Sequence, residues 1–130
     1  MPSPSSQLRW GRRLNNRLSG AWGEELALRY LTRQGYDLIE RNYRTRYGEV
    51  DLILRQGTTI VFVEVKLRRG LAFGDPREAV TPRKQAAVRA LAERYLHERR
   101  PPHFETLRFD VVGVLASGST PKIVHLEDAF

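Results

Sequence analysis

The chain from Gly48 to Lys66 has the sequence GEVDLILRQGTTIVFVEVK, and the remaining elements are predicted to assemble around it. Two apolar runs, at 50–54 and 60–65, flank the turn signal Gln56-Gly57, so the stretch predicts a β-hairpin with buried strands. Charge in a buried strand is costly unless it is paired, binds a metal or takes part in chemistry. The charged residues of this hairpin include Glu49, Asp51, Glu64 and Lys66.

Alternation along each strand puts these four side chains on one side of the hairpin. With the turn centred on Gln56-Gly57, Glu49 lies opposite Glu64, and Asp51 lies opposite Phe62 and diagonal to Glu64. Diagonal neighbours are about 7–8 Å apart at the backbone, so two carboxylates can reach one cation. The cluster therefore indicates a divalent-metal site with an adjacent lysine. A buried salt-bridge cluster is the alternative, since ion-pair networks produce the same pattern.

Composition restricts the class of protein. The 130 residues are enough for one domain with a substantial core. The absence of cysteine excludes disulfides and thiolate metal sites and fits a cytoplasmic location. No apolar run approaches the ~18 residues needed to cross a bilayer, so no membrane association is expected. The 22 basic and 15 acidic residues give a net charge of +7, which predicts an acidic macromolecular partner, nucleic acid before membrane.

The chain is expected to divide into two parts. Residues 1–18 begin with Ser and Pro and become basic, which predicts a mobile arm. Residues 19–130 form the predicted domain. Within it, a helix is expected from the N-cap Ser19 to about Gln34.

Neighbouring acids on this helix should differ in direction. At 100° per residue Glu24 falls within the apolar arc and Glu25 falls opposite it. Glu24 is therefore either a favourable charge in the first helical turn or a third carboxylate over the hairpin.

Basic loops adjoin the hairpin at both ends. A turn from Asn42 to Tyr47 carries Arg44 and Arg46, and a glycine-containing loop from Leu67 to Gly74 carries Arg68 and Arg69. A helix start is expected at Asp75–Glu78, where an N-cap residue is followed by proline and then by glutamate.

The main second helix is predicted from about Pro82 to Glu98. Lys84 lies within its apolar arc, as a stem whose ammonium ends at the core edge or as a cation that reaches the acidic cluster or a phosphate. Lys66, Lys84 and Lys122 are the lysines of an otherwise Arg-rich chain, and lysine is the cation whose pKa burial can shift.

The remaining strands are expected at Tyr36–Asn42, Thr106–Leu115 and Lys122–Leu126, the last at a sheet edge. Both faces of the central strands are apolar, so helices should cover both sides and form a three-layer α/β domain with a mixed sheet of about five strands. Arg108 and Asp110 are interpreted as a structural pair across strands. The histidines lack metal-ligand spacing and are assigned no role.

Several short motifs occur together in this order: Gly20-x-x-Gly23-Glu24-x-x-Ala27, Gly48-Glu49-x-Asp51-Leu52, Phe62-Val63-Glu64-Val65-Lys66, the single Lys84, and Arg108-Phe109-Asp110-Val111-Val112. The combination resembles the bacterial YraN-like family over most of the chain. That family looks like a member of the PD-(D/E)xK nuclease superfamily, with the restriction-endonuclease-like fold, and its pattern is similar to that of archaeal Holliday-junction resolvases.

The resemblance implies roles for individual residues. Asp51 matches the superfamily's metal-binding aspartate, Glu64 the second acid and Lys66 the lysine two positions on, while Glu24 matches the helix-borne acid of the resolvases. Val50 stands where a proline often precedes the motif aspartate. Mg²⁺ or Mn²⁺ would be held by Asp51, Glu64 and the Val65 carbonyl, with Glu24 acting through a water or a second ion. The residues expected to contact nucleic acid are Arg44, Arg46, Arg68, Arg69 and Lys84.

The function implied by the resemblance is that of a metal-dependent nuclease in recombination or repair, with DNA favoured over RNA as its substrate. The sequence suggests no helix that reads the major groove, so structure-selective rather than sequence-selective binding is expected. A homodimer is suggested only by likeness to the resolvases. The alternative is a non-catalytic nucleic-acid-binding module with the same fold. A protein-interaction scaffold fits the net charge of +7 less well.

Overall fold

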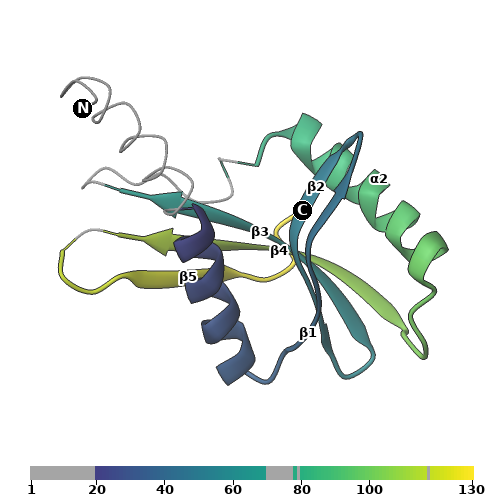
Figure 1. The fold of residues 1–130 in the computed structure, drawn as a ribbon, viewed down its shortest axis with the longest axis horizontal. Coiled ribbons are helices and arrows are strands. Elements are labelled where there is room, and N and C mark those ends of the chain that lie inside the picture. Colours follow the sequence, from purple (N-terminus) through teal and green to yellow (C-terminus); the bar gives the residue numbers. More distant parts are fainter. Residues whose placement is uncertain (1–19, 70–77, 79, 117) are drawn as a thin grey trace, which may run out of the picture.

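A computed structural model describes residues 20–69, 78, 80–116 and 118–130 of the protein. In chain order these residues form a helix over 20–33, β1 (Asp37–Thr45), β2 (Gly48–Gln56), β3 (Thr59–Arg68), α2 (Pro82–Arg99), β4 (Thr106–Leu115) and β5 (Lys122–Leu126) (Figure 1). The predicted basic arm at 1–18, the N-cap Ser19 and most of the predicted helix start at 75–78 lie outside the described residues.

The strands form one five-stranded mixed sheet in the order β1-β2-β3-β4-β5. Strands β1, β2 and β3 are antiparallel neighbours, β3 and β4 are parallel, and β5 returns antiparallel to β4. Helix α2 forms the crossover that a parallel β3–β4 pair requires. The predicted α/β class is confirmed, and the arrangement is compatible with a three-layer restriction-endonuclease-like fold.

The sheet is buried on both faces, by one helix on each (Figure 1). The α2 layer packs Val88, Leu91, Ala92 and Tyr95 on Tyr43, Val50, Ile53, Ile60, Phe62 and Phe109. The other layer packs Ala27 and Leu31 on Tyr36, Leu52, Leu54, Val61, Val63, Val112 and Val114. Successive residues from Leu52 to Leu54 and from Ile60 to Val63 thus enter opposite layers, as the period of two predicts. Val50 departs from this period, because it packs in the α2 layer although Leu52, two residues on, packs in the other.

Local signals position both helices. The Thr81 hydroxyl accepts a 3.2 Å hydrogen bond from the Lys84 N–H, and Pro82 begins α2, as the sequence predicts. The helix over 20–33 ends with Gly35 at a φ of 95°, a left-handed conformation that glycine adopts without strain. These ends agree closely with the predicted ones.

The predicted basic turn at Asn42–Tyr47 is wrong in its extent. Strand β1 continues to Thr45, with Tyr43 paired to Val50 and Arg44 to Glu49. Asn42 has a φ of 50°, a conformation typical of turns, yet the β1–β2 ladder continues past it. The local turn signal is overridden because the strand pairs on both sides of this residue.

The predicted register of the β2–β3 hairpin is wrong by two residues. Phe62 lies opposite Ile53 rather than Asp51, and Gln56 pairs with Thr59, so the turn is Gly57-Thr58. Gly57 has a φ of 61°, which suits the first central position of a two-residue turn, whereas the prediction put this glycine second. Moving the turn by one residue changes every cross-strand partner by two, and a continued ladder would bring Asp51 opposite Glu64.

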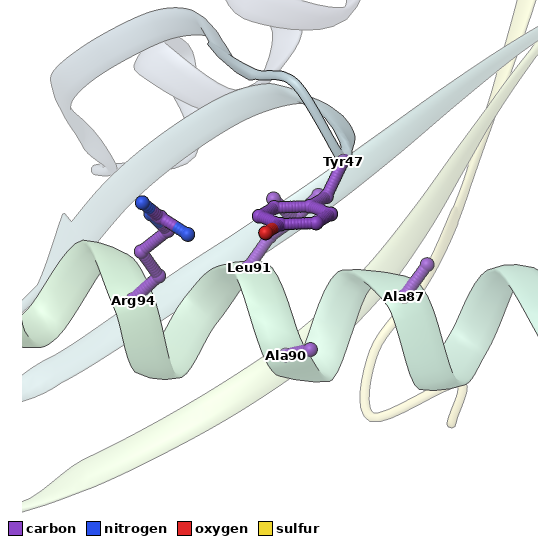
Figure 2. Close-up of a pocket in the computed structure, with 5 residues that line it drawn as sticks. All are labelled: Tyr47, Ala87, Ala90, Leu91 and Arg94. Carbon is purple, nitrogen blue, oxygen red and sulfur yellow. The ribbon is translucent and has the colours of Figure 1, made fainter.

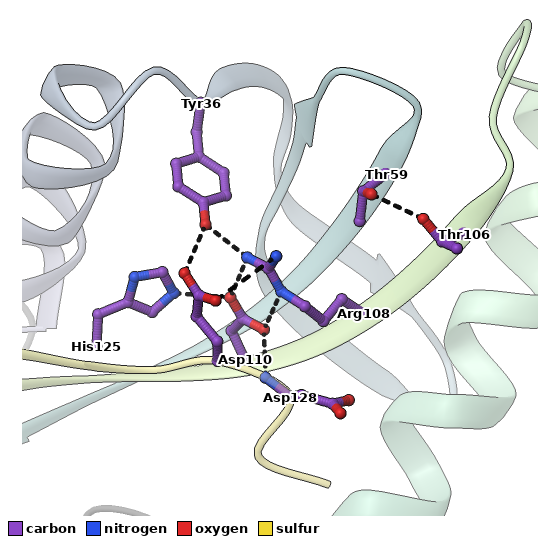
Figure 3. A network of polar contacts seen from close by, with 8 residues as sticks. Tyr36, Thr59, Thr106, Arg108, Asp110, His125 and Asp128 are labelled. Carbon is purple, nitrogen blue, oxygen red and sulfur yellow. Dashed lines mark hydrogen bonds and ion pairs between the residues drawn. The ribbon is translucent and has the colours of Figure 1, made fainter.

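A buried polar network connects β4 with the C-terminal residues (Figure 3). Arg108 donates to Asp110 through Nε and Nη2, both at 2.9 Å, and His125 Nε2 lies 2.7 Å from the same carboxylate. The Asp128 main-chain N–H donates to it at 3.0 Å, and Arg108 also donates to the Tyr36 hydroxyl. Burial alone would raise the pKa of Asp110, but the hydrogen bonds it accepts outweigh burial and hold this pKa below its ordinary value.

The network has the structural character expected of Arg108 and Asp110, with two corrections. These residues pair along one strand, two positions apart, rather than across strands. His125, which the sequence assigned no role, completes the set of partners around the buried carboxylate.

Candidate metal centre and nucleic-acid interface

The β2–β3 ladder ends where the charged residues begin. Its last pair is Leu52 with Val63. Beyond it the Val65 N–H donates to Asp51 Oδ2 at 2.8 Å, so a side chain takes the place of a main-chain acceptor. Adjacent antiparallel strands normally exchange main-chain hydrogen bonds, and a carboxylate in this position separates them. Asp51 is therefore held at the opening between two diverging strands.

The Glu64 side chain is buried at this opening, with 3% of its surface exposed. Its Oε2 atom lies 3.8 Å from Lys84 Nζ, while Oε1 has no hydrogen-bond partner within the described part of the chain. Burial and then the charge of Asp51 raise the pKa of Glu64 to about 7, although Lys84 and Lys66 oppose the shift. A buried carboxylate oxygen without a hydrogen-bond donor raises the free energy of the folded state, and a bound cation would offset this cost.

Two lysines lie beside the two carboxylates. Burial raises the pKa of Asp51, and the Val65 N–H, Lys66 and Lys84 act in the opposite direction. Lys84 is thus the cation that reaches the acidic cluster, one of the two arrangements expected for it. The ion pair leaves Oε1 of Glu64 without a partner among the described residues, so a salt-bridge cluster accounts for only part of this geometry.

Glu24 and Glu25 have the different surroundings that the helical phase predicts. Burial, followed by the charge of Asp51, raises the pKa of Glu24, and Glu49 adds to the shift. Glu25 instead pairs with Arg41 at 3.2 Å and with Arg29 at 3.5 Å. Glu24 is therefore the helix acid that the charges of Asp51 and Glu49 influence, whereas Glu25 pairs with surface arginines.

Glu49 occupies the outer side of the cluster. Its Oε2 atom accepts a 2.7 Å hydrogen bond from Arg44 Nε, and both side chains are exposed. Its negative charge nevertheless raises the pKa of both Asp51 and Glu64. Glu49 is neutralised by a surface arginine and contributes to the field of the site from a distance.

The predicted arginines have different surroundings and do not form one group. Arg44 is engaged by Glu49, and Arg46 stacks on Tyr47 with its Cζ atom 4.9 Å from the ring centroid. Arg68 Nη1 donates to the Leu67 carbonyl at 3.0 Å, and Arg69 is exposed at the end of β3. The loop predicted beyond them, at 70–74, lies outside the described residues.

Two features of the site were not predicted. Asn42 forms a side-chain hydrogen bond that favours the ionised form of Glu24. Tyr47 and Arg94 lie together, with the Arg94 Cζ atom 5.4 Å from the ring centroid, although 47 positions of the chain separate them. Asn42, a residue typical of turns, could have drawn attention to the contact with Glu24. The contact between Tyr47 and Arg94 depends on how α2 packs and had no signal in the sequence.

The ligand inventory of the site is small. Among residues 20–69, 78, 80–116 and 118–130, no three Asp, Glu or His side chains gather as a metal site. The predicted inner ligands contain only two such side chains, Asp51 and Glu64, completed by a main-chain carbonyl. Chemically, the arrangement can place a hard cation between two carboxylates with ammonium groups alongside.

The fold and these residues define an α/β domain with a carboxylate–lysine cluster at the end of a central hairpin. Residues 23–114 match the model of the uncharacterised protein family UPF0102, and the chain belongs to that family. The YraN-like resemblance is thus confirmed at the level of the family.

Curated relatives match over nearly their whole lengths. A UPF0102 protein of Rhodococcus opacus is 52% identical over 117 residues, which are 89% of this chain and 98% of the relative. One from Syntrophomonas wolfei is 50% identical over 88% of this chain and 99% of its own. A third, from Dictyoglomus thermophilum, is 40% identical over 82% of this chain and 89% of its own.

Neither described helix has the length and apolar character needed to span a membrane.

Proposed function

We propose that this protein is a metal-dependent, structure-selective endonuclease of the PD-(D/E)xK superfamily that hydrolyses phosphodiester bonds in DNA. The observation that carries the proposal is the Glu64 carboxylate, which is buried beside Asp51 and has an oxygen without a donor among the described residues. Carboxylates repel the phosphates of nucleic acid, so a surface that only binds DNA gains nothing from burying two of them together. A bound divalent cation reverses this repulsion.

The residues present fit Mg²⁺ or Mn²⁺. Asp51 and Glu64 supply hard oxygen ligands, and the main-chain carbonyl of Val65 supplies a third. The N–H and C=O of one strand residue point to the same side, and the Val65 N–H points to Asp51, so its carbonyl is directed into the same opening. When bound, the ion polarises the phosphodiester and lowers the pKa of the attacking water.

The remaining charged side chains would position the reactants. Lys66 would orient the attacking water, or help to deprotonate it, and offset charge on the phosphate. Lys84 would hold Glu64 in place through the ion pair. Glu24, whose pKa is raised by burial and by Asp51, would contribute through a bridging water or a second ion.

Arg44, Arg46, Arg68 and Arg69 would grip the DNA backbone. Their contribution should not depend on base sequence, and affinity should fall with salt by a slope of about 0.9 per phosphate neutralised on duplex DNA. Arg44 would have to break its ion pair with Glu49 to bind a phosphate, so its contribution to DNA affinity should be smaller than that of Arg46. No helix or strand among the described residues suggests sequence readout, which favours selection by DNA structure.

Cleavage of flaps, single strands and four-way junctions with Mg²⁺ or Mn²⁺ tests the proposal. Wild-type protein should cut at least one of these DNAs, while Asp51→Asn and Lys66→Ala should bind but not cut. Lys122→Ala, which removes an exposed lysine at the sheet edge, is the matched control and should cut like wild type. Equal cleavage by all of these variants would indicate a contaminating nuclease and contradict the assignment.

A non-catalytic nucleic-acid-binding module is the second candidate. It is favoured by the absence, among the described residues, of a cluster of three or more acidic or histidine side chains suited to a metal. This candidate predicts DNA binding without cleavage under every metal condition. The homodimer, the cytoplasmic location and a role in recombination or repair stay predictions under either candidate.

A further inference from the structure

A hollow of about 440 Å³ lies between the β1–β2 turn and the outer surface of α2 (Figure 2). Tyr47 from the turn and Ala87, Ala90, Leu91 and Arg94 from the helix line it. The alanines leave room because their side chains are short, and the floor is therefore apolar. Gly48 brings the turn close to the helix, since a Cβ atom at this position would lie 3.5 Å from Leu91 Cδ1.

Tyr47 presents an aromatic ring to solvent beside this hollow. Its exposed fraction is 61%, and Figure 2 shows the ring above Leu91. Two guanidinium groups accompany the ring: the Cζ atom of Arg46 is 4.9 Å from its centroid and that of Arg94 is 5.4 Å away. Both guanidinium groups lie over the ring, so a nucleobase would stack on Tyr47 by displacing one of them or would stack on the guanidinium itself. Arg94 would then exchange its 2.9 Å ion pair with Glu98 for a phosphate.

The hollow adjoins the carboxylate cluster along two elements. Tyr47 directly precedes β2, in which Asp51 is the fourth residue. Ala87 lies three residues after Lys84, about one helical turn from the residue that pairs with Glu64. A nucleotide at Tyr47 would therefore be a near neighbour of a phosphate at the cluster.

We propose that Tyr47 and the hollow on α2 bind one unpaired nucleobase of the DNA, next to the phosphate that is cut. The inference rests on the proposed function and adds to it the feature by which substrates are selected. A base within a duplex stacks on the bases above and below it and pairs with the opposite strand, so it can reach the Tyr47 ring only by leaving the DNA duplex. An unpaired base in a flap, bulge or overhang can reach the ring directly. Substrates with an unpaired base at this position are preferred over continuous duplex.

Binding to DNA that carries 2-aminopurine tests the inference. In EDTA, wild-type protein should quench the fluorescence of an unpaired 2-aminopurine at a duplex–overhang junction. Tyr47→Phe, which keeps the ring, should quench equally. Tyr47→Ala should lose the quenching and bind the overhang DNA about tenfold or more weakly, with affinity for a fully paired duplex unchanged.

A neighbouring pair of alanines provides the matched control. Ala87→Leu fills the hollow and should weaken overhang binding, while Ala86→Leu adds the same group to an exposed position outside it and should not. The inference is overturned if wild-type protein leaves 2-aminopurine unquenched, or if Tyr47→Ala weakens binding to both DNAs equally.

The same samples separate this inference from the proposed function. Addition of Mg²⁺ or Mn²⁺ to wild-type protein and Asp51→Asn measures cleavage. Quenching that depends on Tyr47, without cleavage by either protein, supports the base site and contradicts the nuclease. Cleavage without quenching supports the nuclease and overturns the base site. If neither DNA binds at low salt, both are overturned.

Discussion

The Lys84 ammonium lies 3.8 Å from the Glu64 carboxylate, and this ion pair joins the first turn of α2 to the buried middle of β3. Thr81 and Pro82 begin the helix three and two residues earlier, so the start of α2 determines which side chain reaches the carboxylate. One third of the lysine side chain is exposed and 3% of that of Glu64, so the pair lies at the boundary between the core and solvent. It is the structural link between the helix and the candidate metal centre.

Removal of this cation should destabilise the protein. Lys84→Gln is expected to lower the free energy of unfolding by about 1 kcal/mol at about pH 8, a value reduced from that of a fully buried pair because Lys84 is partly exposed. Arg83→Gln removes the same charge from an exposed neighbouring position and should have little effect. Urea unfolding in EDTA measures both variants, and equal losses would show that the Glu64 pair contributes nothing specific.

Stability without metal should fall as the pH rises. The pKa of Glu64 is raised from an ordinary value of 4.5 to about 7 in the folded protein. Between these values the folded state keeps a proton that the unfolded state has lost, so the stabilisation is complete below the lower value and is lost as the pH passes the upper one. The expected loss is about 3 kcal/mol.

Urea unfolding in EDTA across this pH range measures the effect, with Glu64→Gln as the comparison. The substituted side chain does not titrate, so the stability difference between the two proteins should shift in favour of the variant as the pH rises. A difference that stays constant with pH would contradict the raised pKa of Glu64.

Divalent metal should stabilise the protein in a pH-dependent way. Mg²⁺ or Mn²⁺ at ten- to hundredfold above Kd should add about 1 to 3 kcal/mol at about pH 8 and less at about pH 5, since ligand carboxylates must lose their protons to bind. Asp51→Asn should abolish the response and, in EDTA, be more stable than wild type, because its amide oxygen can still accept from Val65 N–H without repelling Glu64. Asp37→Asn, at an exposed strand end, should keep the wild-type response.

The two adjacent glutamates of the first helix should differ in their effect on metal binding. Glu24→Gln is expected to weaken Mg²⁺ or Mn²⁺ binding by about tenfold, a usual cost of losing a group just outside the inner ligands. Glu25→Gln removes the same charge from a residue that pairs with surface arginines and should leave affinity unchanged. Calorimetric titration measures the metal affinity of both variants. Weaker binding by Glu25→Gln, with Glu24→Gln unchanged, would contradict the assignment of Glu24 to the site.

The buried network on β4 should support stability and not cleavage. Asp110→Asn should cost about 3 kcal/mol or more, because Arg108 would lose its paired carboxylate in the interior. Asp128→Asn is the control, since that residue contributes only its main-chain N–H to the network. Both variants should retain wild-type cleavage per folded molecule, and loss of cleavage at full folding would assign Asp110 a role in the reaction.

The sequence by itself determined what depends on neighbouring residues. The period of two assigned the residues of β3, of β4 and of β2 from Leu52 onward to their faces, and the 100° rotation per residue separated Glu24 from Glu25. The helix ends at about Gln34 and about Pro82 could be predicted because capping, here by Gly35 and Thr81, is a local interaction. The order of the elements and the chemical character of the candidate site follow from these short-range rules.

Tertiary structure decided what depends on distances between remote segments. A positive φ at Gly57 moved the hairpin turn by one residue and thereby brought Asp51 rather than Glu49 toward Glu64. The packing of α2 on the sheet set the 3.8 Å approach of Lys84 and created the hollow beside Tyr47. These relationships join residues far apart in the chain, and side-chain packing selects among alternatives that local propensity leaves equal in energy.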